Sequence, residues 1–321
     1  MIFKNLALLA PGAPGGMVSR SMKRRVLICG CGYVGIALGR LLVSEGHTVF
    51  GLRRTAASLP ELAAEGISPL LGDISRPADL ESLPGSFDWV VHVASSTGGG
   101  VDEYRSVYLD GLRNLLAWLD RAPDRPSRLV YTSSTSVYGQ TDGSWVDETS
   151  PTNPTTETGA ILVAAEQLLR TAPLRVHATT LRVAGIYGPG RGHLFRQFVA
   201  GKISPPDAPA RWLNMVHRDD VATAIRAALE TGTAGGTYNV ADDEPVLATD
   251  FLNWIAAQLG RDQSRFGTGS SPTRLGKRAE THKQVSNRLI RDELQWSPAF
   301  PTFREGYADA IRAVKAGHFT P

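Results

Sequence analysis

The chain has 321 residues, 42% of them hydrophobic and 20% charged, which is typical of a globular protein. Its 34 basic and 31 acidic side chains leave a net charge of +3, and no basic run appears, which argues against a nucleic-acid partner. A small-molecule substrate fits this balance better.

The two cysteines, Cys29 and Cys31, flank one glycine, so they form no disulfide framework and have no second pair for zinc. We expect no metal site and reduced thiols, as in the cytoplasm. Residues 1 to 22 contain a five-residue apolar run, LALLA, too short for a signal peptide or a membrane span. We interpret residues 1 to 22 as a flexible extension, with Met17 or Met22 as alternative starts.

Strands and helices alternate along the first 187 residues. Apolar runs predict strands at 24–30, 47–52, 67–73, 87–95, 128–134 and 177–185, and helices at 34–45, 102–119 and 156–171. This alternation is typical of an α/β protein with a parallel sheet covered by helices on both faces. We therefore predict a Rossmann-type, doubly wound sheet.

The pattern changes after Tyr187. Residues 188–212 are rich in glycine and proline, and shorter units follow, with helices near 249–259, 286–295 and 304–316. We predict an NAD(P)-binding domain made of 23–187 and 213–241. The smaller C-terminal α/β substrate-binding cap would consist of 188–212 and 242–316, followed by a tail at 317–321.

A glycine motif directly follows the first predicted strand. In GCGYVG, Gly30, Gly32 and Gly35 have the G-x-G-x-x-G spacing, and the motif opens a helix as a dinucleotide fingerprint does. Gly30 permits a tight turn, Gly32 lets a pyrophosphate approach, and Gly35 lets helix and strand pack closely. The amides of Tyr33 and Val34 would then meet the anion at the helix N-terminus.

The end of the second predicted strand indicates which cofactor binds. NAD enzymes usually place an acidic residue there, whereas this chain has Arg53 and Arg54, which suit a ribose 2′-phosphate. We expect NADP(H) to be preferred, with NAD(H) possible. Two solvated arginines in a loop are the alternative. Four further cofactor contacts are expected after the third and fourth strands: Asp73, Ile74, Ala94 and Ser95.

Nine motifs together resemble the extended short-chain dehydrogenase/reductase family, also called the NAD-dependent epimerase/dehydratase family. They span about residues 24 to 316: GCGYVG, LLGD, DWVVHVAS, GLRNLLAWL, SSTSVYG, LRVAGIYGPG, NMVHRDDVATAI, GTYNVADDEP and QVSNRLIRDELQWSPAFPTFREGYADAI. The resemblance implies a substrate-holding serine at Ser134, with Ser136 close by. It also implies a Tyr-x-x-x-Lys pair on the next helix.

That pair is missing from the sequence. Thr158 stands at the tyrosine position and Leu162 at the lysine position, and none of the eight tyrosines has a lysine four residues later. Threonine has no accessible pKa, and leucine cannot lower the pKa of a neighbour. The chain therefore resembles the atypical branch of the family, with its proton relay lost or moved.

Other side chains are candidates to complete the site. Tyr138 and Tyr187 follow strand ends, where ligands bind in such sheets, although packing is an alternative for both. Arg191 and His193 lie in the expected substrate loop. Arg191 would bind an anionic group of the substrate, and His193 would titrate near neutral pH. The alternative for each residue is a solvated side chain without a role in binding.

The helix at 156–171 is apolar around nearly its whole circumference, which indicates burial on more than one side. We therefore expect a homodimer formed through the helices at 102–119 and 156–171, without membrane contact. The function we predict is that of an NADP(H)-binding oxidoreductase or epimerase-like enzyme acting on a small polar, sugar-like or carbonyl substrate. The alternative is a non-catalytic NADP(H) sensor or scaffold.

Overall fold

The computed structural model describes residues 22–96, 98, 100–172, 177–205, 208, 211–261 and 281–319. The predicted N-terminal extension lies outside this range except for Met22. No helix within the described part of the chain is both long and apolar enough to cross a bilayer.

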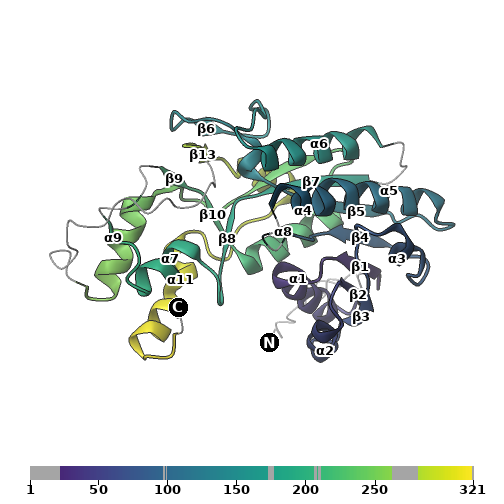
Figure 1. Cartoon of the computed structure of the whole chain (residues 1–321), viewed down its shortest axis with the longest axis horizontal. Coiled ribbons are helices and arrows are strands. Elements are labelled where there is room, and N and C mark those ends of the chain that lie inside the picture. The colour runs from purple at the N-terminus through teal and green to yellow at the C-terminus, as the bar shows by residue number, and fades with distance from the viewer. Residues whose placement is uncertain are drawn as a thin grey trace, which may run out of the picture.

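A seven-stranded parallel sheet forms the larger lobe, which confirms the predicted fold (Figure 1). Its order is β11-β7-β5-β4-β1-β2-β3, and every neighbouring pair is parallel. The strands are β1 (Arg25–Cys29), β2 (Thr48–Arg53), β3 (Ser68–Leu71), β4 (Trp89–His92), β5 (Arg128–Ser134), β7 (His177–Val183) and β11 (Thr237–Val240). Their carboxyl ends share one edge, where ligands bind in such sheets.

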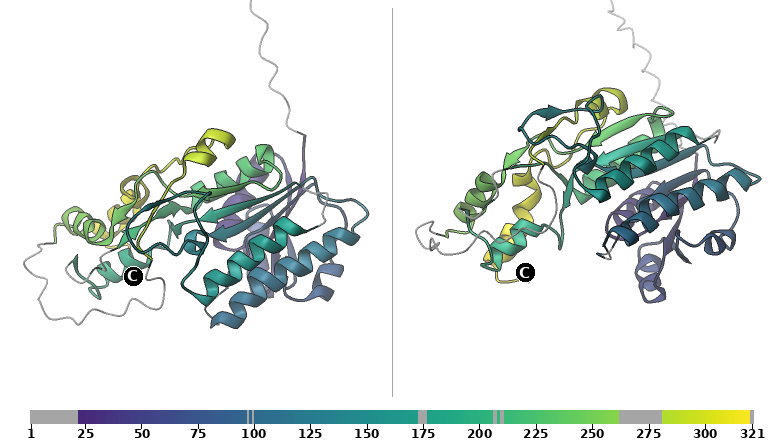
Figure 2. Two further views of the ribbon diagram at one scale, coloured as in Figure 1. Left: turned by 90° about the horizontal axis from the view of Figure 1, so that it is seen from above. Right: turned by 45° about the horizontal axis from the view of Figure 1, so that its top comes forward.

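Helices cover both faces of the sheet because side chains alternate along each strand. Val26 and Ile28 of β1 pack into one apolar cluster with α1 (Tyr33–Ser44) and α8 (Arg218–Thr231). Leu27 and Cys29 belong to a second cluster with α5 (Gly111–Arg121) and α6 (Glu157–Thr171). Figure 1 shows these two helical layers, and in Figure 2 α5 and α6 run side by side. The short helices η1 (Ala56–Ser58), α2 (Leu59–Ala64) and α3 (Pro77–Glu81) lie in the loops around β2 and β3.

The helix predicted at 102–119 is divided by a wider turn. It consists of α4 (Gly100–Arg105), a π-helical turn η2 (Ser106–Asp110) and α5. At this turn Nε2 of the buried His92 lies 3.3 Å from the Val107 carbonyl, and the rings of Tyr104 and Tyr108 stack at 4.2 Å. The spacing of apolar residues in the sequence does not reveal tertiary contacts of this kind, so the π-helical turn was not predicted.

The smaller lobe has its own aromatic core, formed by Phe195, Phe198, Phe251, Phe303, Tyr307 and their apolar neighbours. Its helices are α7 (His193–Val199), α9 (Ala248–Gln258) and α11 (Phe303–Lys315). Three two-stranded pairs join the lobes: β8 (Gly185–Tyr187) with β10 (Met215–His217), β9 (Trp212–Leu213) with β12 (Val246–Leu247), and β6 (Trp145–Val146) with β13 (Gln284–Val285).

The C-terminal part of the chain returns to the larger lobe. The helix α10 (Arg288–Leu294) places Ile290 and Leu294 in the apolar cluster of the sheet, together with Val285 and Trp296. The range 242–316, predicted as cap, thus contributes to both lobes.

Candidate functional site

The glycine turn after β1 is shaped for a close ligand. Gly30 has φ +86°, and a Cβ there would lie 2.2 Å from the Cα of Ala94, so only glycine fits. A Cβ at Gly35 would lie 3.0 Å from the Gly30 carbonyl, which shows the close packing expected from the motif. At Gly32, by contrast, the nearest atom to a Cβ is 3.9 Å away, so its outer side is open.

The N-terminus of α1 offers unpaired amides beside this open glycine. Gly32 is the N-cap and supplies no side-chain hydrogen bond, and no acidic side chain lies in the first turn. The amides of Tyr33 and Val34 have no partner within the helix, and the helix dipole favours an anion there. The residues present therefore fit the pyrophosphate of a dinucleotide.

Arg53 and Arg54 lie at the end of β2, on one side of the glycine turn. Arg53 donates from Nη1 to the Cys31 carbonyl at 2.9 Å and lies 3.6 Å from Glu61. Arg54 forms an ion pair with Glu103 at 3.4 Å. A 2′-phosphate bound here would compete with these two carboxylates for the guanidinium groups.

The remaining predicted cofactor residues lie along the same edge. Asp73 accepts hydrogen bonds from the amide and hydroxyl of Ser75, at 2.9 and 2.7 Å. Ile74 is 5% exposed and packs in the cluster under α5, so only its backbone faces this edge. Ala94 backs the glycine turn, and Ser95 is exposed.

Ser134 and Ser136 keep part of their surface exposed at the end of β5. Ser134 caps the short 3-10 helix η3 (Thr135–Val137), and its Oγ accepts a hydrogen bond from the Ser136 amide at 3.2 Å. A lone pair and the hydroxyl proton of Ser134 remain for a ligand. The structure thus leaves both serine side chains partly accessible at the carboxyl end of β5.

Thr158 and Leu162, on α6, supply no proton relay. Leu162 is fully buried in the apolar cluster beside α1 and α8. The hydroxyl of Thr158 lies 3.2 Å from that of Thr156, the N-cap of α6. One side chain therefore packs, and the other joins the cap of the helix.

The geometry argues against Tyr138 as a proton donor. Its side chain is fully buried, its hydroxyl donates to Asn239 Oδ1 at 2.9 Å, and it accepts from Arg182 Nη1 at 2.8 Å. Burial raises the pKa of this phenol even though Arg182 lowers it. The hydroxyl is thus engaged in an internal network and turned away from any substrate.

Tyr187 is likewise a packing residue in this structure. It is 2% exposed and stacks on Tyr307 with ring centroids 4.6 Å apart. Its hydroxyl donates to the Thr302 carbonyl at 3.4 Å, and burial raises its pKa far above the neutral range. Its position at a strand end predicts that Tyr187 lies near the site, but residues of the smaller lobe cover its ring.

The predicted substrate residues lie in the loop after β8. His193 is exposed and opens α7, whereas the guanidinium of Arg191 stacks on Tyr33, with Cζ 4.4 Å from the ring centroid. The structure therefore places Arg191 against the glycine turn rather than beside His193.

One buried amine beside Tyr138 was not predicted from the sequence. Lys283 is 5% exposed, and its Nζ donates to the Tyr138 carbonyl at 3.0 Å. Burial lowers the pKa of Lys283 to about 8. Because 145 residues separate it from Tyr138, no local spacing could have predicted this contact.

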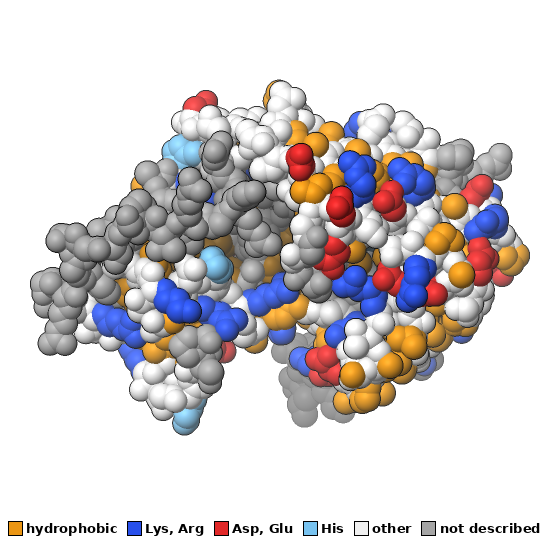
Figure 3. Space-filling model, in the orientation of Figure 1, with side chains coloured by type: hydrophobic (Ala, Val, Ile, Leu, Met, Phe, Trp, Pro, Cys, Tyr) orange, Lys and Arg blue, Asp and Glu red, His pale blue; other side chains and the backbone are white. Residues whose placement is uncertain are grey.

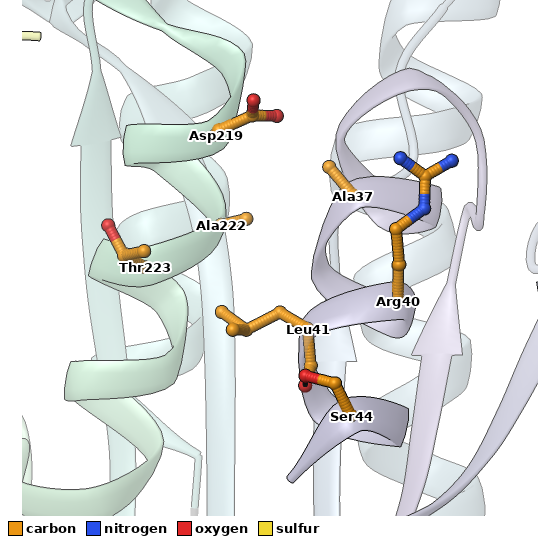
Figure 4. Close-up of a pocket in the computed structure, with 7 residues that line it drawn as sticks. All are labelled: Ala37, Arg40, Leu41, Ser44, Asp219, Ala222 and Thr223. Carbon is orange, nitrogen blue, oxygen red and sulfur yellow. Dashed lines mark hydrogen bonds between the residues drawn. The ribbon is translucent and has the colours of Figure 1, made fainter. Parts of the chain in front are cut away.

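One groove of about 370 Å³ lies away from this edge, between α1 and α8 (Figure 4). Leu41 of α1 points toward α8, where Ala222 and Thr223 form the opposite wall. The groove is lined by the C-terminal half of α1 and the first turns of α8, and neither Ser134 nor Ser136 lines it.

Three comparisons relate the chain to known proteins. A model of the NAD dependent epimerase/dehydratase family matches residues 26–241. Protein YeeZ of Escherichia coli (strain K12) is 32% identical over 250 residues, which cover 76% of this chain and 86% of that protein. The 2-alkyl-3-oxoalkanoate reductase of Shewanella oneidensis is 28% identical over 261 residues, covering 70% of this chain and 63% of that protein.

A solved structure agrees with these matches. A Methylobacillus flagellatus protein assigned to the NAD-dependent epimerases/dehydratases superposes with a TM-score of 0.71 at 33% identity, covering 91% of this chain and 99% of that one. The family match confirms the prediction of an NAD(P)-dependent enzyme of the short-chain dehydrogenase/reductase type. The chain belongs to the NAD-dependent epimerase/dehydratase family.

Proposed function

We propose that the protein is an NADP(H)-dependent oxidoreductase that acts on a small polar carbonyl or sugar-like substrate. The observation that carries this proposal is the pairing of an open glycine turn at β1 with the partly exposed Ser134 and Ser136 at β5. Both lie at the carboxyl edge of one parallel sheet, where ligands bind in open α/β folds. A relative named as a reductase is consistent with carbonyl chemistry.

In this proposal the chain's own residues bind and orient. The α1 amides would hold the pyrophosphate, and the two serine hydroxyls would hold the substrate oxygen. A bound NADPH would supply the hydride for the carbonyl carbon. Because Tyr138 and Tyr187 are buried, the proton for the carbonyl oxygen would have to come from water through the serine hydroxyls.

The preference for NADP(H) depends on Arg53 and Arg54. We expect replacement of both by alanine to weaken NADPH binding about tenfold or more, because charge-assisted hydrogen bonds to a phosphate contribute roughly 1.5–3 kcal/mol. NADH, which lacks the 2′-phosphate, should bind about equally to both proteins. Calorimetric titration measures this, and an equal loss for the two cofactors would contradict the preference.

A panel of carbonyl compounds with NADPH tests catalysis by loss of absorbance at 340 nm. We expect turnover of at least one compound and its loss in Ser134→Ala.

The buried Leu162 favours a second candidate, a non-catalytic NADP(H) sensor, because the lysine position holds a core residue. That candidate predicts no turnover across the panel and different affinities for NADP⁺ and NADPH.

A further inference from the structure

The loop after β8 presses directly on the first residue of α1. A Cβ at Gly188 would lie 2.9 Å from the Tyr33 hydroxyl and 3.0 Å from His217 Nε2. The Arg191 amide donates to the Gly188 carbonyl at 2.9 Å, which closes the loop into a tight turn. The smaller lobe thus reaches across to the glycine motif at this point.

Two guanidinium groups flank Tyr33 in this contact. Cζ of Arg191 lies 4.4 Å and Cζ of Arg218 lies 5.1 Å from the ring centroid. Arg218 is paired with Asp219 at 2.8 Å. No carboxylate partner of Arg191 is found among the residues that the structure describes, and its side chain is exposed.

The hydroxyl of Tyr33 has no partner either. It is buried and makes no hydrogen bond within the described chain. Burial raises the pKa of Tyr33 to about 12, although Arg218 and Arg191 act to lower it. The buried hydroxyl faces the Gly188 loop, whereas the guanidinium of Arg191 is exposed beside the first residue of α1, where it suits an anion.

We propose that Arg191 binds the cofactor's pyrophosphate, so that the smaller lobe completes the dinucleotide site. This inference rests on the proposed function. The sheet order places β2, with Arg53, on one side of β1, and β4, β5 and β7 on the other. Arg191 stacks on Tyr33, the first residue of α1, so its guanidinium lies beside the helix N-terminus that would hold the diphosphate. Figure 3 shows basic side chains gathered on the smaller lobe near the hollow between the lobes.

The test compares Arg191→Ala with wild type by calorimetry. The ligands are NADPH, NADH, ADP-ribose and adenosine 2′-monophosphate, of which only the last lacks the diphosphate. We expect affinity for the first three to fall about tenfold or more, and affinity for the fourth to stay within about twofold. Arg191→Lys, which keeps the charge but loses the planar fork, should restore part of the affinity.

The control is Arg196→Ala, which removes an equally exposed charge from α7. If that variant weakens binding as much as Arg191→Ala, the effect is general electrostatics and the inference is wrong. If Arg191→Ala binds all four ligands as tightly as wild type does, Arg191 does not bind the pyrophosphate and the inference is wrong. If wild type binds none of them, the proposed function itself fails, and the inference with it.

Discussion

A buried ion pair between β7 and α6 lies beside the end of β5, the strand that leads to the two serines. Arg182 and Glu166 are each 7% exposed and meet at 2.8 Å. Ser133 donates to Glu166 at 2.6 Å, and Tyr138 accepts from Arg182 at 2.8 Å and donates to Asn239. The network fixes the ends of two central strands, so it supports the site without contacting a ligand.

Arg182→Met should therefore destabilise the protein strongly. It leaves the Glu166 carboxylate buried without its cation, which typically costs about 3–5 kcal/mol. Urea denaturation followed by circular dichroism measures the free energy of unfolding. The control Arg226→Met removes half-buried ion pairs with Glu230 and Glu45 and should cost no more than about 1 kcal/mol. An equal loss of unfolding free energy in the two variants would show that the buried network stabilises the protein no more than a half-buried ion pair does.

Asp242 gives a prediction about pH. It is 2% exposed, and its Oδ2 has no hydrogen-bond partner within the described chain. Burial, reinforced by Asp243, Glu244 and Asp220, raises its pKa from 3.8 to about 8. The folded protein therefore holds a proton that the unfolded chain releases above pH 4, so this group lowers stability as pH rises from about 4 to about 8.

Asp242→Asn keeps the shape of the side chain and removes the titration. The variant's free energy of unfolding minus that of wild type should increase as pH rises from 5 to 8, by up to about 1.4 kcal/mol per pH unit. Urea denaturation at four pH values measures the difference between the two proteins. A difference that does not change with pH would show that Asp242 is ionised in the folded state.

Among the elements, strands were the most predictable. Each of the six predicted strands has an observed counterpart, because continuous apolar runs bounded by glycine have few other solutions. The π turn at Ser106–Asp110 was not predictable, since it depends on contacts with His92 and between two tyrosine rings. On α6, two of the apolar residues, Ala160 and Ala164, are exposed together with Gln167.

We propose that this exposed stripe on α6 forms the contact of the predicted homodimer. Ala164→Arg should convert a dimer to a monomer, because a long charged side chain separates two helices that pack through small residues. Light scattering measures the mass. Ala63→Arg, at an exposed alanine of α2, is the matched control and should leave the mass unchanged. Leu162 is unsuitable for this test because it is fully buried.

For the molecule as a whole, local sequence patterns indicate candidate residues at the cofactor edge but not the long-range contacts around them. The glycine turn, Arg53 and the serines are local features of strand ends and could be read directly. The burial of Tyr138 and Tyr187, the amine of Lys283 and the contact of Arg191 with Tyr33 depend on how the smaller lobe packs. Those contacts join residues distant in the chain, and no local pattern specifies them.

The repeated passage of the chain between the lobes has a genetic consequence. The segment from β10 to β11 returns to the sheet, and α10 returns again before α11 closes the smaller lobe. Neither lobe is encoded by one uninterrupted stretch of DNA, so recombination cannot transplant the smaller lobe onto another nucleotide-binding domain in a single event.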